Sequence, residues 1–449
     1  MTTLEEMKKA HVETAFTEDS LALSFAEHHA SDMRYVTTWG RWFIWDGTRW
    51  IRDDTQLATD KSRELCRAAA QSTNKLKTAQ SLASRRVISN VESLSQSDRK
   101  IATTIDQWDA DGWLLNTPGG TVNLKTGASK AHDREDFITK STAVAPRDSC
   151  PLWESFITRV TGGNAELATF LQRVSGYSLT GDTTEHALFF LYGEGGNGKG
   201  VFLNTIAGIM GDYALTASMD AFVVTHNDRH PTELAAMRGA RLVTAQETEE
   251  GRRWAESKIK ALTGGDKISA RFMRQDFFEF TPQFKLVIAG NFKPALRGVN
   301  EAIRRRMNLV PFTMKIAESE RDPQLAEKLR AEWPGILAWM IRGCVEWQDA
   351  GLRQPGAVLE ATQEYLAEED STSAWFDELC VRDANAKTLG AAAWGSWVRW
   401  AEGAGVFVGD RKRFYRTMDA MGFQRGIREG APLFRGFSIR NWMPEGNEY

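Results

Sequence analysis

A glycine-rich stretch that follows a short apolar run constrains the fold more than any other feature of the chain. The apolar run is Leu188-Phe-Phe-Leu-Tyr192, the glycine-rich stretch is residues 193–200, and residues 201–210 have helical character. Glycines let backbone N–H groups turn inward around phosphate oxygens, and the start of the following helix adds partial positive charge. The order strand, glycine loop, helix therefore predicts a phosphate-binding loop in an α/β fold.

The glycine-rich stretch supplies the candidate nucleotide-binding residues. Lys199 is placed to reach the β- and γ-phosphates of ATP. The usual pattern ends in Ser or Thr, which holds Mg²⁺, but this chain has Gly200 there. The alternative is a glycine-rich turn without a ligand; the flanking strand and helix favour ATP with Mg²⁺. The candidates are Gly193, Gly195, Gly196, Asn197, Gly198, Lys199 and Gly200.

Two further short apolar runs, residues 241–245 and 285–289, predict other buried strands of a mainly parallel sheet. The first is followed by acids, among which Glu247 is the first candidate and Glu249 the second to hold Mg²⁺ and orient water. Gln246 stands where an acid is common, and an acidic loop in solvent is the alternative. Asn291 follows the other strand and is a candidate sensor of the γ-phosphate, although Asn is also common in turns.

A basic triplet, Arg304, Arg305 and Arg306, follows Asn291 in the chain. Such a triplet can lie in solvent or contact DNA, but it can also complete the site of a neighbouring subunit. An arginine supplied in this way contributes about 10³–10⁵ in rate. We therefore expect assembly into a ring to be a condition of activity.

Residues 260–278 combine Gly264-Gly265 with alternating basic and apolar residues. This pattern predicts a loop or hairpin that carries positive charge, with Lys267, Arg271 and Arg274 as candidate contacts to the phosphates of DNA. An ordinary surface hairpin is the alternative.

The flanking regions differ in texture from the central one. Before residue 150 we predict a hairpin over residues 43–51 with a two-residue Asp-Gly turn, helix over 57–84 and short strands over 114–127. After residue 340 we predict helices, with apolar stripes from Leu389 to Trp400 and from Phe414 to Met421, and then a hairpin over 423–439, in an arrangement like a winged helix. The expected domains are therefore 1–150, 151–335 and 336–449.

The charge balance limits how this chain could contact nucleic acid. The 56 basic and 59 acidic residues give a net charge of −3, so DNA contacts must come from local patches. Residues 381–440 form one such patch, with eleven Lys or Arg and five Asp or Glu.

The four cysteines include no CxxC pair, and we find neither a membrane span nor a secretory signal. We expect a cytoplasmic protein, in a bacterial host.

Taken in order, these motifs resemble the superfamily 3 helicases of the AAA+ class. The resemblance is strongest to the helicase part of the phage and plasmid primase–helicases related to the poxvirus primase–helicase. It rests on residues 193–199, 239–249, 260–271, 285–291 and 305–312, and on N-terminal stretches at 42–50, 114–127 and 150–153. It implies an AAA+ P-loop core between an α+β N-terminal domain and a helical, winged-helix-like C-terminal domain.

The resemblance also implies a function and roles for the residues. It implies a homo-hexamer that hydrolyses ATP to move along single-stranded or forked DNA during replication of a phage, plasmid or mobile island. A separate primase, polymerase or single-strand-binding protein would be a partner. Lys199 would bind phosphate, Glu247 and Glu249 would serve Mg²⁺ and water, and Asn291 would sense the γ-phosphate. The arginine triplet would act across the subunit interface.

Two other functions stay open at this point. A replication initiator that assembles on origin DNA without unwinding it would be consistent with Gly200 and Gln246. A single-subunit phosphotransferase would need no ring, and the arginine triplet argues against it. We interpret Asp109-Ala-Asp111 as structural because no Ser-x-His partner is near, and His226 with His230 as a polar loop because Pro231 interrupts a helix there.

Overall fold

The computed structural model describes residues 16–147, 149–225, 232–247, 252–274, 276–296, 301–428 and 431–440. His226, His230, Pro231 and Glu249, which the sequence singles out, lie outside these ranges. The chain divides into two compact units, one made of residues 1–123 and 128–142 and the other of residues 124–127 and 143–449.

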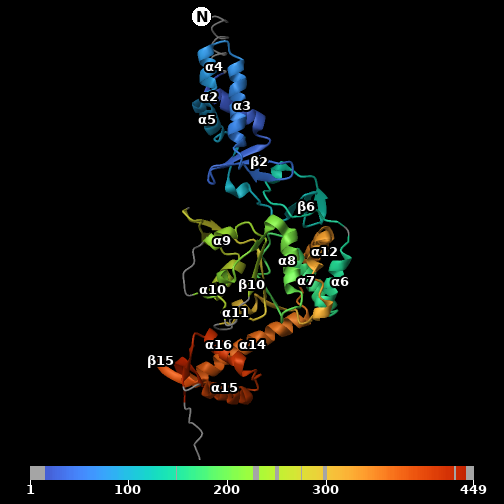
Figure 1. Cartoon of the computed structure of the whole chain (residues 1–449), viewed down its shortest axis with the longest axis vertical. Coiled ribbons are helices and arrows are strands. Elements are labelled where there is room, and N and C mark those ends of the chain that lie inside the picture. Colours follow the sequence, from blue (N-terminus) through green and yellow to red (C-terminus); the bar gives the residue numbers. More distant parts are fainter. Residues whose placement is uncertain are drawn as a thin grey trace, which may run out of the picture. The chain divides into compact units, whose positions relative to one another are not determined.

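Among its described residues, the first unit has four α-helices, labelled together in Figure 1, and two small sheets. The helices and strands predicted within residues 43–51, 57–84 and 114–127 are confirmed, with the helical stretch broken between residues 71 and 76. The helices are α2 (Glu18–His29), α3 (Leu57–Gln71), α4 (Leu76–Leu82) and α5 (Arg85–Ser95). One sheet has the order β3-β2-β1-β4, from β3 (Trp50–Arg52), β2 (Arg41–Trp45), β1 (Met33–Val36) and β4 (Ala102–Thr103). The other has the order β5-β6-β7, from β5 (Leu114–Thr117), β6 (Gly120–Asn123) and β7 (Ala128–Lys130).

The predicted two-residue Asp-Gly turn in the first hairpin is wrong. Trp45 pairs with Trp50, so four residues connect β2 to β3. The Asp46 carboxylate accepts hydrogen bonds from the backbone N–H groups of Thr48 and Arg49, at 2.7 and 2.8 Å. This side-chain turn offers the chain an alternative to the tight primed turn.

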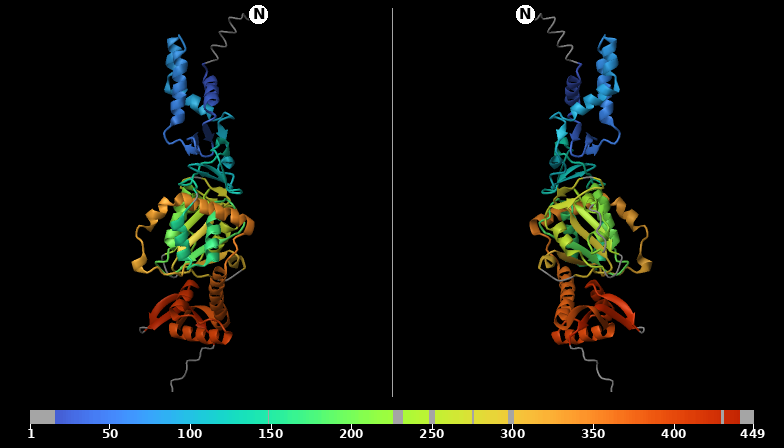
Figure 2. Two further views of the ribbon diagram at one scale, coloured as in Figure 1. Left: turned by 90° about the vertical axis from the view of Figure 1, so that its right-hand side faces the viewer. Right: turned by 90° about the vertical axis from the view of Figure 1, so that its left-hand side faces the viewer.

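A five-stranded parallel sheet forms the centre of the second unit, as the sequence predicts. Its order is β14-β8-β13-β10-β9, and every neighbouring pair of strands is parallel. Figure 2 shows the strands inside the unit with helices around them. The sequence predicts three of these strands and misses the two edge strands. The strands are β8 (Leu188–Tyr192), β9 (Ala214–Thr216), β10 (Leu242–Glu247), β13 (Lys285–Gly290) and β14 (Met307–Pro311).

Both faces of this sheet are covered because its strands are apolar on both sides. On β8, Phe189 packs against Phe170 of α7, whereas Phe190 packs against Trp254 in the core on the other face. The remaining helices and strands around the sheet are α6 (Pro151–Val160), α7 (Ala165–Tyr177), α8 (Lys199–Met210), α9 (Thr232–Ala236), α10 (Glu256–Thr263), β11 (Ile268–Ala270), β12 (Phe278–Phe280), α11 (Glu301–Arg304), α12 (Leu325–Ala331), α13 (Trp333–Ala350) and α14 (Gly356–Leu379).

The C-terminal part has a three-stranded sheet of order β15-β17-β16 and two helices around an aromatic core that includes Trp375, Trp397 and Phe414. The predicted helices and hairpin are present, whereas β15 was not predicted. Leu389 precedes its helix and is 43% exposed, so it is not part of the buried stripe. The elements are β15 (Cys380–Leu389), α15 (Gly390–Ala404), α16 (Arg411–Ala420), β16 (Gln424–Arg428) and β17 (Ala431–Ile439).

All four cysteines are buried and none forms a disulfide. Within the described ranges, no helix has both the length and the apolar character that crossing a membrane requires.

Candidate nucleotide-binding site

The glycine-rich loop connects β8 to α8, as the sequence predicts. Gly196 and Gly198 have φ angles of +78° and +87°, in the left-handed region that favours glycine. A Cβ atom at Gly198 would also lie 2.6 Å from the Val160 side chain. These positions therefore require glycine, and the resulting bend leads the backbone into the first turn of α8.

The Lys199 ammonium group is the central feature of this loop. It donates hydrogen bonds to the carbonyl oxygen of Gly193 (2.6 Å), to Oδ1 of Asn197 (3.0 Å) and to Oδ1 of Asn291 (3.1 Å). Lys199 is only 6% exposed, and burial lowers its pKa. The fold thus brings together a lysine and an asparagine that are 92 residues apart in the chain.

The backbone of Glu247, the first acid expected beside this lysine, lies at the carboxyl end of the sheet, where the glycine loop also begins. Residue 247 pairs with Gly290 at the ends of β10 and β13, next to Asn291. Of Glu247 the structure describes the backbone, and Glu249 lies outside the described residues. The Nε2 atom of Gln246 is 3.5 Å from Oδ1 of Asn204 on α8, at the limit of a hydrogen bond.

The surroundings of Gly200 bear on the prediction of Mg²⁺. A Cβ atom at this exposed position would meet nothing within 4 Å, so there is room for a side chain that the sequence does not provide. No cluster of three or more His, Cys, Asp or Glu side chains that could hold a metal occurs among the residues that the structure describes. The loop therefore supplies no side-chain oxygen for Mg²⁺ at position 200.

Within one chain, the arginine triplet lies at the opposite end of the parallel strands from the glycine loop. The carbonyl of Arg306 accepts a hydrogen bond from the backbone N–H of Leu188, at the start of β8, whereas the glycine loop follows the end of β8. Five residues of strand span about 16 Å, so these arginines do not meet Lys199 of the same chain. Arg306 donates to Oγ1 of Thr263 (3.1 Å) and to the carbonyl of Ala302 (2.8 Å), whereas Arg305 is exposed.

The predicted basic hairpin is formed by β11 and β12, which pair antiparallel. Lys267 precedes β11, at the opposite end of the strand from Arg271 and Arg274, so the fold does not bring these three cations together. Sequence reasoning missed the apolar side chains of the connection between the strands, where Phe272, Met273 and Phe277 are 38%, 68% and 59% exposed. Large apolar residues next to Arg271 and Arg274 in the sequence were the signal that could have indicated this exposed cluster.

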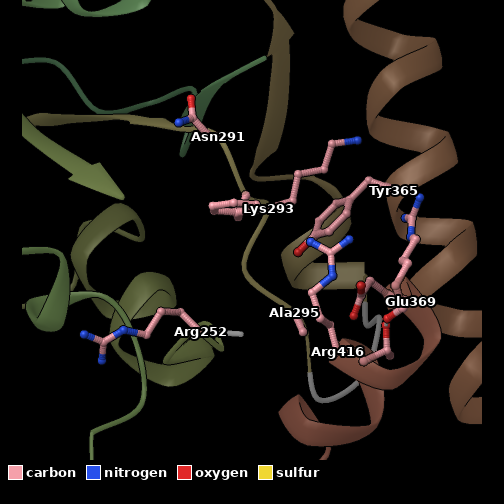
Figure 3. A pocket seen from close by; sticks show the side chains of 10 residues that line it. Arg252, Asn291, Lys293, Ala295, Tyr365, Glu369 and Arg416 are labelled. Carbon is pink, nitrogen blue, oxygen red and sulfur yellow. Dashed lines mark hydrogen bonds between the residues drawn. The ribbon is translucent and has the colours of Figure 1, made fainter. Parts of the chain in front are cut away.

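A cavity of about 200 Å³ lies beside Asn291, among the loop after β13, α14 and α16. Figure 3 shows Asn291 at one margin of this cavity, away from Glu369. The Glu369 carboxylate accepts a hydrogen bond from the backbone N–H of Leu296 at 2.9 Å, and burial raises its pKa to about 7. Burial also lowers the pKa of the neighbouring Lys293 to about 8. Glu369 therefore ties α14 to the loop that carries Asn291.

The raised pKa of Glu369 predicts how stability changes with pH. The folded chain holds this proton more tightly than the unfolded chain, so the contribution is present at low pH and is lost as pH rises from 4.5 through 7. Glu369→Gln keeps the acceptor for Leu296 but cannot ionise. Relative to the wild type, the variant should gain about 2–3 kcal/mol in the free energy of unfolding between pH 5 and pH 8. Urea denaturation at both pH values measures this gain, and equal changes in the two proteins would contradict the prediction.

A buried lysine in a glycine loop at the end of a parallel sheet defines an α/β protein with a candidate phosphate site. Comparisons with known proteins show what the chain is similar to. Residues 22–162 match the family described as D5 N terminal like, and residues 191–306 match a family of unknown function (DUF5906). These matches support the primase–helicase family that the sequence predicts.

The curated relatives are viral proteins. The candidate helicase L207/L206 of Acanthamoeba polyphaga mimivirus is 27% identical over 305 residues, which cover 62% of this chain and 32% of that protein. The candidate helicase 022R of Frog virus 3 is 24% identical over 321 residues, which cover 65% of this chain and 30% of that protein. The chain thus aligns with about a third of the length of these relatives.

Several solved structures align with most of the chain. One of them, of the C-terminal region of NrS-1, is 10% identical, with a TM-score of 0.45, over 90% of this chain and 95% of that one. A TM-score of this size does not establish a common fold.

Proposed function

We propose that this chain is an ATP-dependent DNA helicase or translocase of superfamily 3, with an AAA+ core that acts as a hexameric ring. Its role would be in the replication of a phage, plasmid or mobile island. One observation carries the proposal. The buried Lys199 ammonium contacts three neutral oxygens, and in the described part of the chain no carboxylate forms a hydrogen bond or ion pair with it. A buried cation in a glycine loop needs an anion, and a nucleotide phosphate meets that need.

The position of Asn291 gives the proposal a mechanism. Its amide oxygen accepts from Lys199, so an anion that draws the ammonium away would release Asn291. Asn291 begins the loop whose residue Leu296 is bonded to Glu369 of α14, and α14 leads into the basic C-terminal part. We infer that nucleotide binding at Lys199 is transmitted to the C-terminal part through this loop, and that Glu247 and Glu249 serve Mg²⁺ and the attacking water.

Strand separation is the property that tests the proposal as a whole. The purified chain, incubated with ATP and Mg²⁺, should separate a forked DNA duplex and hydrolyse ATP faster when single-stranded DNA is present. An initiator, which the residues Gly200 and Gln246 favour, would bind nucleotide and DNA without separating strands. A monomeric phosphotransferase would fail to form a ring with nucleotide in sedimentation. Either result would refute the helicase.

The exposed aromatic residues of the β11–β12 hairpin predict how the chain holds single-stranded DNA. Phe272 stacks on Phe278, and the Arg271 guanidinium lies 4.6 Å from the centre of the Phe277 ring. Bases stacked on such rings contribute about 1–3 kcal/mol each. Phe272→Ala and Phe277→Ala should therefore each weaken binding of a fluorescent single-stranded oligonucleotide by about 5- to 100-fold.

The matched control removes an exposed apolar side chain elsewhere. Leu76 begins α4 and is 73% exposed, so Leu76→Ala removes comparable apolar surface without touching the hairpin. Its DNA affinity should equal that of the wild type. Unchanged affinity in both phenylalanine variants would show that the hairpin does not stack bases.

A further inference from the structure

The segment after β14, residues 312–321, lies against the glycine-rich loop at several points. Oδ1 of Asn197 accepts from Lys199 while its Nδ2 atom donates to the carbonyl of Phe312 at 2.7 Å. The backbone N–H of Ile316 donates to the carbonyl of Gly196 at 3.1 Å. The segment is thus bonded both to the loop backbone and to the side chain that holds Lys199.

Arg321 ends this segment and lies directly over the loop. A Cβ atom built on Gly196 would be 2.4 Å from a terminal nitrogen of Arg321 and 3.0 Å from its central guanidinium carbon. Nε of Arg321 donates to the carbonyl of Ile316 at 3.2 Å, and Ile316 is itself bonded to Gly196. The guanidinium is therefore held against the loop, and in the described part of the chain only its Nε donates a hydrogen bond.

Arg321 is exposed, unlike Lys199, but its hydrogen bond is likewise to a neutral oxygen and not to a carboxylate. Neighbouring charged residues have acidic partners, since Arg159 contacts Glu320 and Lys315 lies 3.9 Å from Glu194. Within the described ranges, Arg321 forms no ion pair. The loop thus has two cations, Lys199 and Arg321, whose contacts are to neutral oxygens.

We propose that Arg321 binds the phosphate chain of the nucleotide from within the same subunit. This inference rests on the proposed nucleotide site and adds a residue to it. A guanidinium offers paired donors that match phosphate oxygens. Gly200 supplies no hydroxyl group that could hold Mg²⁺ beside the phosphates. A second cation next to the loop would supply positive charge to the phosphates in its place.

The alternative role for Arg321 is purely structural, as a clip that holds the segment on the loop through Ile316. The two roles predict different results for Arg321→Ala in the 449-residue chain. A phosphate ligand predicts an unchanged melting temperature without nucleotide and an affinity for ATP that falls about 10- to 100-fold. A clip predicts a lower melting temperature without nucleotide. It also predicts that the ATP affinity of the folded variant equals that of the wild type.

The experiment measures the melting temperature and calorimetric ATP affinity of the wild type, Arg321→Ala, Arg321→Lys and Arg159→Ala. Arg159→Ala is the matched control because it removes a cation paired with Glu320, one residue from Arg321. Partial recovery in Arg321→Lys and wild-type affinity in Arg159→Ala are expected. If the wild type binds ATP and Arg321→Ala binds it equally well, this inference alone is wrong. If the wild type binds no nucleotide, the proposed function fails as well.

Discussion

Lys199→Met is expected to abolish ATP binding without lowering the stability of the chain. The lysine is buried in the glycine loop, and burial lowers its pKa because the charged form loses its hydration. Removing the cation deletes the group that attracts the phosphates, so the affinity for ATP should fall by at least about 100-fold, or ~3 kcal/mol. Methionine fills a similar volume without a charge, so the free energy of unfolding without nucleotide should stay equal or rise.

The combination of these two results distinguishes a binding residue from a structural one. A lysine that only supported the loop through Gly193, Asn197 and Asn291 would give a less stable variant. Calorimetric titration with ATP and urea denaturation measure the two quantities on the same samples. Lys315→Ala is the control, because Lys315 is a 71% exposed cation next to Glu194 of the same loop. A Lys199→Met protein that binds ATP normally would remove the basis of the proposed function.

Arg305→Ala is expected to abolish ATP hydrolysis and leave ATP binding intact. Arg305 is exposed at the opposite end of the strands from Lys199 of its own chain, so any contact with a bound nucleotide would have to be with that of a neighbouring subunit. Loss of such an arginine lowers the rate by about 10³-fold or more. Steady-state hydrolysis and calorimetric binding, measured with the ring assembled, separate the two effects.

Mixing variants tests whether the arginine acts between subunits. Arg305→Ala and Lys199→Met are each expected to be inactive, but a mixed ring would contain some interfaces with an intact lysine on one side and an intact arginine on the other. Hydrolysis should therefore partly return when the two variants are mixed. No recovery, together with normal mixed assembly, would exclude action between subunits. Arg306→Ala should instead lower stability, because Arg306 bonds to Thr263 and Ala302 within its own chain.

The candidate site was predictable from the sequence where its signal is local. The β8 strand, the glycine loop and α8 are continuous in the chain, and the apolar runs of β10 and β13 are long enough to indicate buried strands. Asn291 could be placed at a strand end because it directly follows β13. The hairpin over residues 43–51 is also predictable because its signal is local. Its turn is not, because hydrogen bonds to the Asp46 side chain stabilise a four-residue connection.

Other parts of the site arise only when distant segments meet. The edge strand β14 borders β8 across more than a hundred residues, and the segment after it brings Arg321 onto Gly196. No local pattern marks Arg321, because its position depends on contacts made by Phe312 and Ile316. Glu369 likewise looks like one acid among several on a helix until the fold buries it beside Leu296.

The sequence alone thus determined the three inner strands β8, β10 and β13 and the lysine-bearing glycine loop after β8, because glycine conformation and apolar periodicity act over a few residues. Only the tertiary structure decided which strands are neighbours, which cations are bonded within their own chain, and which residues face the loop. The reason is physical: neighbours in a parallel sheet are joined by long crossovers, so their order depends on the packing of the whole unit.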